Sequence, residues 1–182
     1  MPAMTDPYFS KTVTYICTHN QDGAMGVIIN RCSDVTVASL FEQIQLETES
    51  LSLLAKVVHY GGPVQTERGF VLHNILPSPH EEFNSTIVIN NTVALTTSKD
   101  ILEATVDNKG PNKMLIALGY AGWTAGQLED EMAQNAWLSL KASRIEEAHA
   151  LIFDAPNQDK FDLAMDMMGL NLANFSHNAG HA

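Results

Sequence analysis

Short apolar and β-branched segments alternate with polar turns along this chain, a pattern that predicts a protein rich in β-strands. Residues 11–18 and 26–30 are two such segments, and the Asp-Gly turn between them predicts a β-hairpin. Further strands are expected at residues 56–60, 68–73, 86–90, 92–95 and 114–118. The last of these is apolar at every position, as in a strand that is buried on both faces.

Helices are predicted where apolar residues recur at spacings of three and four. Thr36 is expected to cap the first helix and Thr97 or Ser98 the second, whereas residues 45–55 are expected to form a loop. Further helical segments are predicted near residues 125–136, 144–150 and 161–168. Because strands and helices interleave, we expect an α/β fold, α+β-like in character, in which helices flank a mixed sheet in one domain over residues 1–182.

The charge of the chain argues against nucleic acid as a partner. The net charge is −11, from 21 acidic and 10 basic residues, and the basic residues are scattered along the sequence. An anionic membrane surface is disfavoured for the same reason. No apolar run reaches the roughly 18–20 residues of a membrane span, and the N-terminus lacks the features of a secretory signal, so a cytoplasmic location is expected.

Cys17 and Cys32 lie on either side of the turn of the predicted hairpin. Pairing about this turn places Cys17 opposite residues 26–28, so that Cys32 lies roughly 10–20 Å further along the strand, at about 3.3 Å per residue. This separation is too large for a disulfide bond. Two reduced and packed thiols are expected.

A glycine- and aromatic-rich segment at residues 119–129 is the most informative motif. It follows the apolar strand and precedes a helix, where exposed backbone amides can receive an anion. However, it is not a G-x-G-x-x-G motif, no P-loop lysine follows, and the acidic residues 129–131 would repel phosphate. We therefore interpret it first as a strand-to-helix turn with packed aromatic residues, and second as a ligand or partner site. Its candidate binding residues are Gly119, Tyr120, Gly122, Trp123, Gly126 and Gln127.

Arg68 and His73 complete the set of candidate binding residues. Arg68 follows a Gly-Gly-Pro turn and could face a carboxylate or phosphate, although an ion pair with an acidic residue of the protein is the favoured interpretation. His73 would lie near His59 if their strands paired, but no motif supports a third metal ligand such as His19. No metal and no cofactor are therefore expected.

These motifs together resemble the AlgH/YqgE family. The matching segments are MPAM at 1–4, DPYF at 6–9, CTHN at 17–20, GAMGVIIN at 23–30, GGPV at 61–64, RGFVLH at 68–73, TTSKDIL at 96–102, GYAGW at 119–123, GQLE at 126–129, NAWL at 135–138 and AGHA at 179–182. The resemblance implies a bent, partly barrel-like sheet flanked by helices. It implies no agreed catalytic residues, and one member of the family has been proposed as a transcriptional regulator of alginate production.

Three departures from the family pattern change these expectations. Family members usually begin with an apolar strand before residues 1–4, and without it the neighbouring strand would be an open edge through which a homo-oligomer could form. The stretch 138–152 is longer than usual. Phe161 stands where the family usually has Trp, an apolar replacement that should preserve packing.

The leading hypothesis for function is a non-catalytic binding or regulatory role, with an unidentified protein or small-molecule partner bound around residues 119–127. No G-x-S-x-G elbow is present and no catalytic residue is assigned. The alternative is an enzyme whose acids and histidines meet only in the fold, for example His73 or His19 beside a carboxylate of raised pKa. A third hypothesis, a DNA-binding regulator, predicts strongly salt-dependent binding to duplex DNA.

Overall fold

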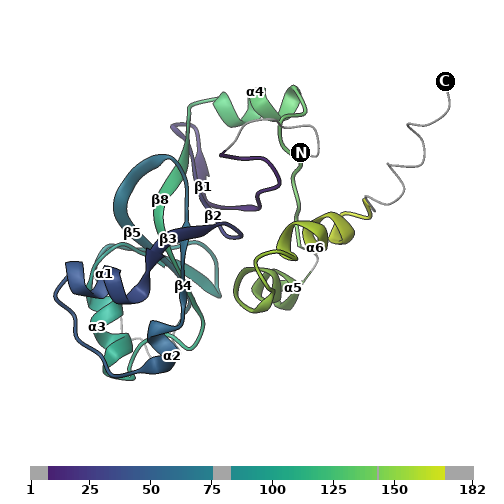
Figure 1. The fold of residues 1–182 in the computed structure, drawn as a ribbon. Helices are drawn as coiled ribbons and strands as arrows, with labels where there is room; N and C mark the ends of the chain where they lie inside the picture. Colours follow the sequence, from purple (N-terminus) through teal and green to yellow (C-terminus); the bar gives the residue numbers. More distant parts are fainter. Residues whose placement is uncertain (1–7, 76–82, 143, 171–182) are drawn as a thin grey trace.

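Within the described residues, 8–75, 83–142 and 144–170, eight strands of this computed structural model form one curled sheet with the shape of a half-barrel (Figure 1). The strands are β1 (Thr14–Asn20), β2 (Gly23–Ile28), β3 (Cys32–Thr36), β4 (Val57–Tyr60), β5 (Val64–Asn74), β6 (Thr86–Val88), β7 (Val93–Thr96) and β8 (Met114–Thr124). Six of them follow the order β1-β2-β8-β5-β7-β6, while β4 pairs with both β3 and β8. The expected mixed sheet is confirmed, because β4 and β8 run parallel and the other pairs run antiparallel.

The helices lie around the curled sheet. They are α1 (Val37–Gln43), α2 (Leu51–Leu54), α3 (Asp100–Val106), α4 (Gln127–Ala133), α5 (Ile145–His149), the π-helix η1 (Ala150–Asp154) and α6 (Lys160–Met167). The first three lie together at one end, α4 follows the far end of β8, and α5 and α6 lie apart on the other side (Figure 1). None of the helices in the described part of the chain is both long and apolar enough to cross a membrane.

Local patterns in the sequence located most of these elements correctly. The predicted first hairpin is β1 and β2, whose tight turn pairs Asn20 with Gly23. The predicted cap of α1 is also confirmed, since the Thr36 hydroxyl accepts a hydrogen bond from the Ser39 amide at 3.1 Å. The predicted cap of α3 is wrong: that helix begins after Lys99, and the Ser98 hydroxyl hydrogen-bonds to the Asp100 carboxylate instead.

The predicted loop at residues 45–55 contains the short helix α2. Ser50, which immediately precedes α2, caps this helix by accepting a hydrogen bond from the Leu53 amide. Leu53 itself is buried against α1 and α3. The apolar contact made by this leucine therefore stabilises a helical turn in the leucine-rich end of a stretch that was expected to form a loop or a loosely packed turn.

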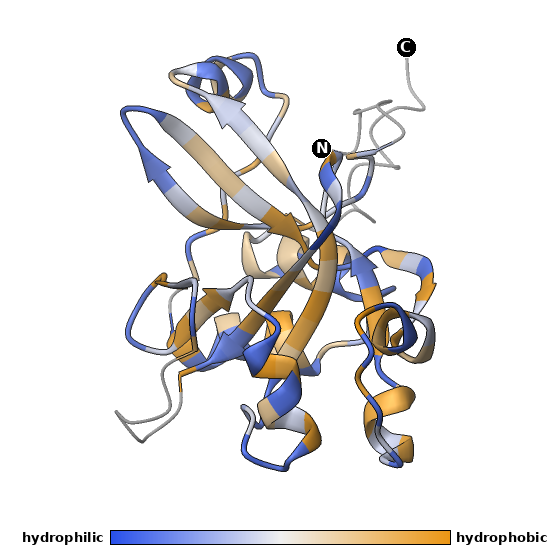
Figure 2. Cartoon of the chain, turned by 90° about the vertical axis from the view of Figure 1, so that its left-hand side faces the viewer, coloured by the Kyte–Doolittle hydropathy of each residue, from blue (hydrophilic) through white to orange (hydrophobic). Residues whose placement is uncertain are grey.

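Two hydrophobic layers cover the middle of the sheet on opposite faces. Leu115 and Ala117 of β8 contribute to the layer under η1, whereas Ile116 faces α1, α2 and α3. This alternation confirms that the apolar segment 114–118 is buried on both faces. Hydrophobic residues accordingly concentrate along the central strands (Figure 2).

The strand β8 is longer than its apolar pattern predicts. It continues through residues 119–124, so the predicted strand-to-helix turn is confined to residues 125 and 126, immediately before α4. At Gly119, with φ of 73°, β8 passes directly against Gly62 in the connection between β4 and β5, and a Cβ atom on either glycine would overlap the backbone of the other segment. At this point β8 stops pairing with β4 and begins to pair with β2.

The two ends of the six-strand order are β1 and β6. An end strand pairs along one side only, so its other side can accept a further strand. Homo-oligomer formation through an open sheet edge stays a prediction.

We expect Gly119→Ala to lower the free energy of unfolding by about 3–5 kcal/mol, from the left-handed backbone together with the overlap with Gly62. Gly126→Ala is the matched control, because Gly126 has a similar φ of 76° and no atom lies within 4 Å of the place that a Cβ would take. This control should cost only about 1 kcal/mol. Urea denaturation of both variants checks the prediction, and equal losses of stability would contradict it.

Candidate functional site

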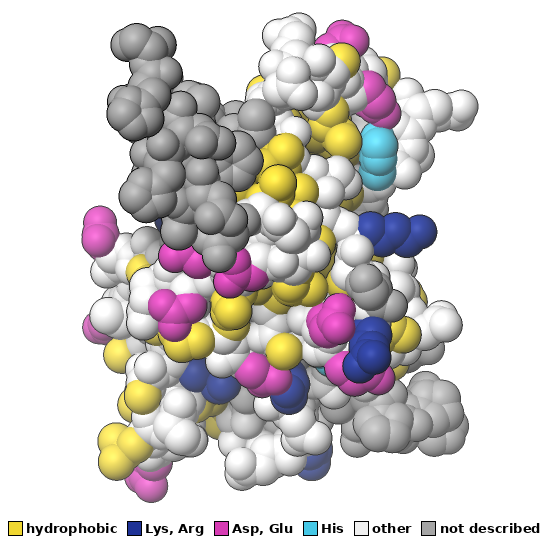
Figure 3. All heavy atoms as spheres, turned by 90° about the vertical axis from the view of Figure 1, so that its right-hand side faces the viewer, with side chains coloured by type: hydrophobic (Ala, Val, Ile, Leu, Met, Phe, Trp, Pro, Cys, Tyr) yellow, Lys and Arg dark blue, Asp and Glu magenta, His cyan; other side chains and the backbone are white. Residues whose placement is uncertain are grey.

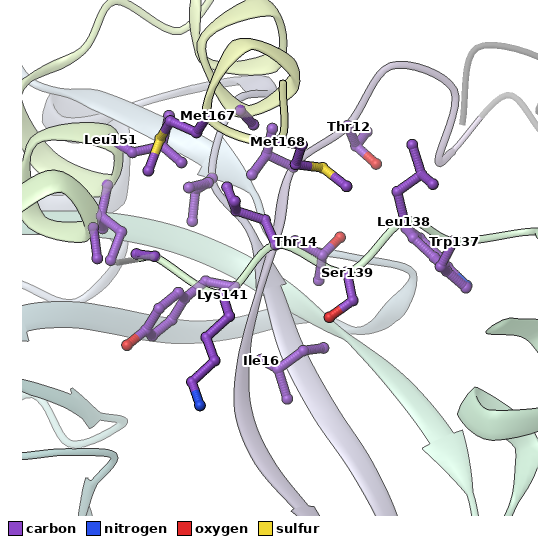
Figure 4. Close-up of a pocket in the computed structure, with 18 of the residues that line it drawn as sticks. Thr12, Thr14, Ile16, Trp137, Leu138, Ser139, Lys141, Leu151, Met167 and Met168 are labelled. Carbon is purple, nitrogen blue, oxygen red and sulfur yellow. The ribbon is translucent and has the colours of Figure 1, made fainter. Parts of the chain in front are cut away.

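A cavity of about 470 Å³ lies between β1 and the described residues of 137–168, which we call the C-terminal segment. Strand β1 contributes Thr14 and Ile16, while Leu138 and Lys141 come from the irregular stretch that follows α4 (Figure 4). Side chains of α5, η1 and α6 complete the wall. The cavity therefore exists only where the first strand and the last helices of the described chain come together.

The lining of the cavity is mainly apolar. Half of the eight methionines of the chain contribute to it, namely Met132, Met165, Met167 and Met168. Leucine, isoleucine, alanine and aromatic side chains supply most of the remainder. Methionine is flexible and polarisable, so this wall can adapt to apolar molecules of different shapes. Hydrophobic side chains also gather in the middle of the face that carries α5 and α6 (Figure 3).

Trp123 and Trp137, which are the two tryptophans of the chain, form the aromatic edge of the cavity. Their rings meet edge to face with centroids 5.7 Å apart, and Phe9 packs against Trp137 at 5.3 Å. Both indole N–H groups donate to one carboxylate oxygen of Glu131, at 2.9 Å from Trp123 and 2.7 Å from Trp137. Glu131 thus fixes the orientation of both rings.

Gln127 supports this carboxylate from one turn earlier in α4. Its amide nitrogen donates to the second oxygen of Glu131 at 2.9 Å, and its amide oxygen accepts from the Thr124 backbone at 3.0 Å. Partial burial by itself raises the pKa of Glu131, but the hydrogen bonds from Trp137, Gln127 and Trp123 outweigh it, so the pKa is lowered. Glu131 is therefore an ionised acceptor at neutral pH, and its role here is to hold the tryptophans.

The candidate residues of segment 119–127 are separated by the fold. Trp123 lines the cavity and Gln127 acts indirectly through Glu131. Tyr120 instead packs against Phe70 in the core, with ring centroids 5.3 Å apart. The three glycines shape the backbone: Gly119 and Gly122 lie within β8, and Gly126 precedes α4.

Arg68 and His73 lie away from the cavity lining. Arg68 is exposed and donates to the Thr97 hydroxyl at 3.0 Å, and among the described residues the expected ion pair is not formed. His73 is 4% exposed, between the Thr96 hydroxyl at 2.9 Å and the Asn74 carbonyl at 3.0 Å. Burial lowers the pKa of His73, although the backbone contact opposes this shift. Both ring nitrogens of His73 therefore have hydrogen-bond partners within the protein.

The suggested approach of His59 to His73 is wrong, because β8 lies between the strands that carry them. The third suggested ligand, His19, is exposed and lies 2.6 Å from the carboxylate of Glu129. A hydrogen bond from its own backbone amide, followed by the contact with His19, lowers the pKa of Glu129. In the described part of the chain, no group of three or more histidine, cysteine, aspartate or glutamate side chains could hold a metal ion.

Lys160 attaches the C-terminal segment to the sheet. It is 2% exposed, and its ammonium donates to the carbonyls of Ile29 at 2.8 Å and Ile152 at 2.9 Å. Burial lowers the pKa of Lys160 to about 8, although the negative charge of an ionised Cys32 would act in the opposite direction. A buried cation thus joins η1 and α6 to the chain that follows β2.

Asn157 makes a second connection beside Lys160. Its side-chain oxygen lies 3.1 Å from a ring nitrogen of His59, and its amide nitrogen donates to the sulfur of Cys32 at 3.4 Å. Both cysteines are reduced, as expected, and Cys17 is packed, with burial raising the pKa of its thiol to about 12. Cys32 is exposed, so the expectation that it is packed is wrong.

Sequence reasoning did not find most of the cavity. Glu131 and Trp137 could have been found from the sequence. Glu131 follows Gln127 by four residues, so both lie on one face of the predicted helix, and Trp137 comes six residues after Glu131. Lys141 and Thr14 could not have been found from local sequence spacing. Their importance depends on β1 lying beside the C-terminal segment.

Replacing Lys160 with Met should remove the rise in stability with pH that Lys160 contributes between about pH 8 and 10.5. In this range the unfolded wild type binds more protons than the folded protein, so its free energy of unfolding rises with pH relative to the variant. The relative rise should approach about 3 kcal/mol. Urea denaturation at several pH values measures it.

Lys109→Met is the control for this experiment, because Lys109 is exposed. The raised pKa of Cys17 lowers stability at high pH in all three proteins and cancels in the comparison. Parallel stability curves for wild type and Lys160→Met would show that the buried ammonium imposes no such cost.

Comparisons with known proteins agree with the fold. The sequence profile of the AlgH-like family matches residues 1–173. A UPF0301 protein of Thiobacillus denitrificans is 50% identical over 182 residues, which are 100% of this chain and 93% of the relative. A UPF0301 protein of an Azoarcus species is 47% identical over 182 residues, covering 100% of this chain and 92% of that protein.

Two solved structures are similar to this chain. The solution structure of the AlgH protein from Pseudomonas aeruginosa has a TM-score of 0.77 and 43% identity, covering 100% of this chain and 92% of that one. A crystal structure of a protein from Corynebacterium diphtheriae has a TM-score of 0.63 and 20% identity, covering 92% and 81%, and this likeness concerns the fold alone. The resemblance inferred from the sequence motifs is confirmed: this chain belongs to the AlgH-like family.

Proposed function

We propose that this AlgH-like protein is a non-catalytic binding protein that holds a small molecule with an apolar body in the cavity between β1 and the C-terminal segment. The observation that carries the proposal is the cavity itself, with a volume of about 470 Å³ and a mainly apolar lining. Small-molecule sites commonly have volumes of about 300–1,000 Å³ and apolar walls with a few polar groups.

The walls of this cavity are held apart by contacts that do not depend on a ligand. Glu131 orients both tryptophans at one edge, and Lys160 attaches the helices of the opposite wall to the sheet. A cavity between independently fixed walls cannot collapse by a local shift of side chains, so it is suited to a ligand rather than to closure.

The enzyme hypothesis receives less support from the geometry. Its named candidates, His73 and His19, do not line the cavity, and no described histidine, cysteine, aspartate or glutamate does. His73 is enclosed by Thr96 and Asn74, while His19 and Glu129 form a contact at the surface. General acid–base chemistry most often uses histidine or a carboxylate, and a described lining without either favours binding over catalysis.

We expect the neutral fluorescent probe N-phenyl-1-naphthylamine to bind wild-type protein saturably and at one site. Ala148 lines the cavity, so Ala148→Trp should fill part of it and weaken binding at least about tenfold. Probe fluorescence during titration measures the affinity.

Ala133→Trp is the matched control, because Ala133 is exposed on α4 and does not line the cavity. This variant should bind the probe as wild type does. Circular dichroism and urea denaturation establish that both variants are folded. Failure of the wild type to bind, or equal binding by folded Ala148→Trp, would overturn the proposal.

A further inference from the structure

The charges at the cavity have the opposite sign to those of the chain as a whole. Acidic residues outnumber basic ones by 21 to 10 in the sequence. Nevertheless, no described aspartate or glutamate lines the cavity, whereas Lys141 and Arg144 both do. The charged side chains of the described lining are therefore all positive, in a protein of net charge −11.

No described residue neutralises either of these cations. Lys99 and Lys113 form ion pairs with Glu103 and Asp154, but within the described ranges Lys141 and Arg144 form none. Both are exposed, three residues apart in the sequence, at the rim of the cavity. Their charges are available to a ligand that enters beside them.

One residue of the cavity wall carries a buried polar atom without a partner among the described residues. This atom is the hydroxyl oxygen of Thr14, which receives no hydrogen bond from them. Thr14 belongs to the wall formed by β1, and the methionines of α6 lie on the other side (Figure 4). Buried hydroxyls are nearly always hydrogen-bonded in folded proteins, so Thr14 is an exception in this part of the wall.

We infer that the ligand is a single-chain anionic amphiphile, of the chemical class of fatty carboxylates and alkyl phosphates. This inference rests on the proposed binding function and specifies its ligand. The hydrocarbon chain lies among the methionine, leucine and tryptophan side chains, and the anionic head group lies at Lys141 and Arg144. Guanidinium and ammonium groups together suit carboxylate or phosphate oxygens.

The preferred charge of the head group can be tested with three molecules that share one hydrocarbon chain. They are decanoate, 1-decanol and decyltrimethylammonium, each used as a monomer in solution. The two tryptophans of the chain both line the cavity, so intrinsic fluorescence reports binding directly. We expect decanoate to bind about tenfold more tightly than decanol, and the cation to bind most weakly.

Charge variants locate the head group. Lys141→Gln combined with Arg144→Gln should weaken decanoate binding about tenfold and leave decanol binding unchanged. The control combines Lys56→Gln with Lys109→Gln, which removes the same two positive charges from exposed positions outside the cavity lining. This control should bind both compounds as wild type does. Decyl phosphate serves as a second anion and should lose affinity in the same variant.

The outcomes separate the two proposals. If N-phenyl-1-naphthylamine binds in the cavity but decanoate has no advantage over decanol, the anionic ligand is refuted and the binding function stands. Unchanged decanoate affinity in the rim variant, or an equal loss in the control, refutes the assignment to Lys141 and Arg144. If the wild type does not bind N-phenyl-1-naphthylamine, the binding function itself is refuted.

Discussion

The sheet is organised by the contact between two backbones at Gly62 and Gly119. A side chain on either residue would overlap the backbone around the other one. Because the contact is possible, β8 can pair with β4 and β5 in its first half and with β2 in its second. That change of partner curls the sheet and carries Trp123 toward the edge of the cavity. Gly119, which the sequence suggested as part of a ligand-binding loop, therefore allows β8 to pass close to a neighbouring backbone.

The cavity depends on a second long-range connection, the hydrogen bonds from Lys160 to the Ile29 and Ile152 carbonyls. Burying an ammonium group is unfavourable, as the lowering of the Lys160 pKa to about 8 indicates. The two carbonyls and the packing around them offset this cost. The result is a helical wall fixed opposite β1, at a distance from the sheet that leaves a cavity between them.

Charge and shape act together at this cavity. The protein as a whole repels anions, yet two cations stand at the rim of an apolar interior that contains no described acid. In the proposed complex, the apolar interior binds the hydrocarbon part of the ligand, and Lys141 and Arg144 favour a negatively charged head group. Long-range repulsion between the acidic surface and an anion slows encounter, so selection by Lys141 and Arg144 acts mainly on how long a bound anion remains.

The sequence by itself determined most of the strands, although not β3, together with the first hairpin, the cap at Thr36 and membership of the AlgH-like family. These features depend on neighbouring residues or on motifs read in order. It also identified Trp123 as a residue of interest. Only the tertiary structure decided that Gly119 lies within a strand, that His59 and His73 are separated by β8, and that the cavity forms at all. Strand partners and cavity walls are set by contacts between residues far apart in the chain, such as Ile29 and Lys160, which local periodicity does not encode.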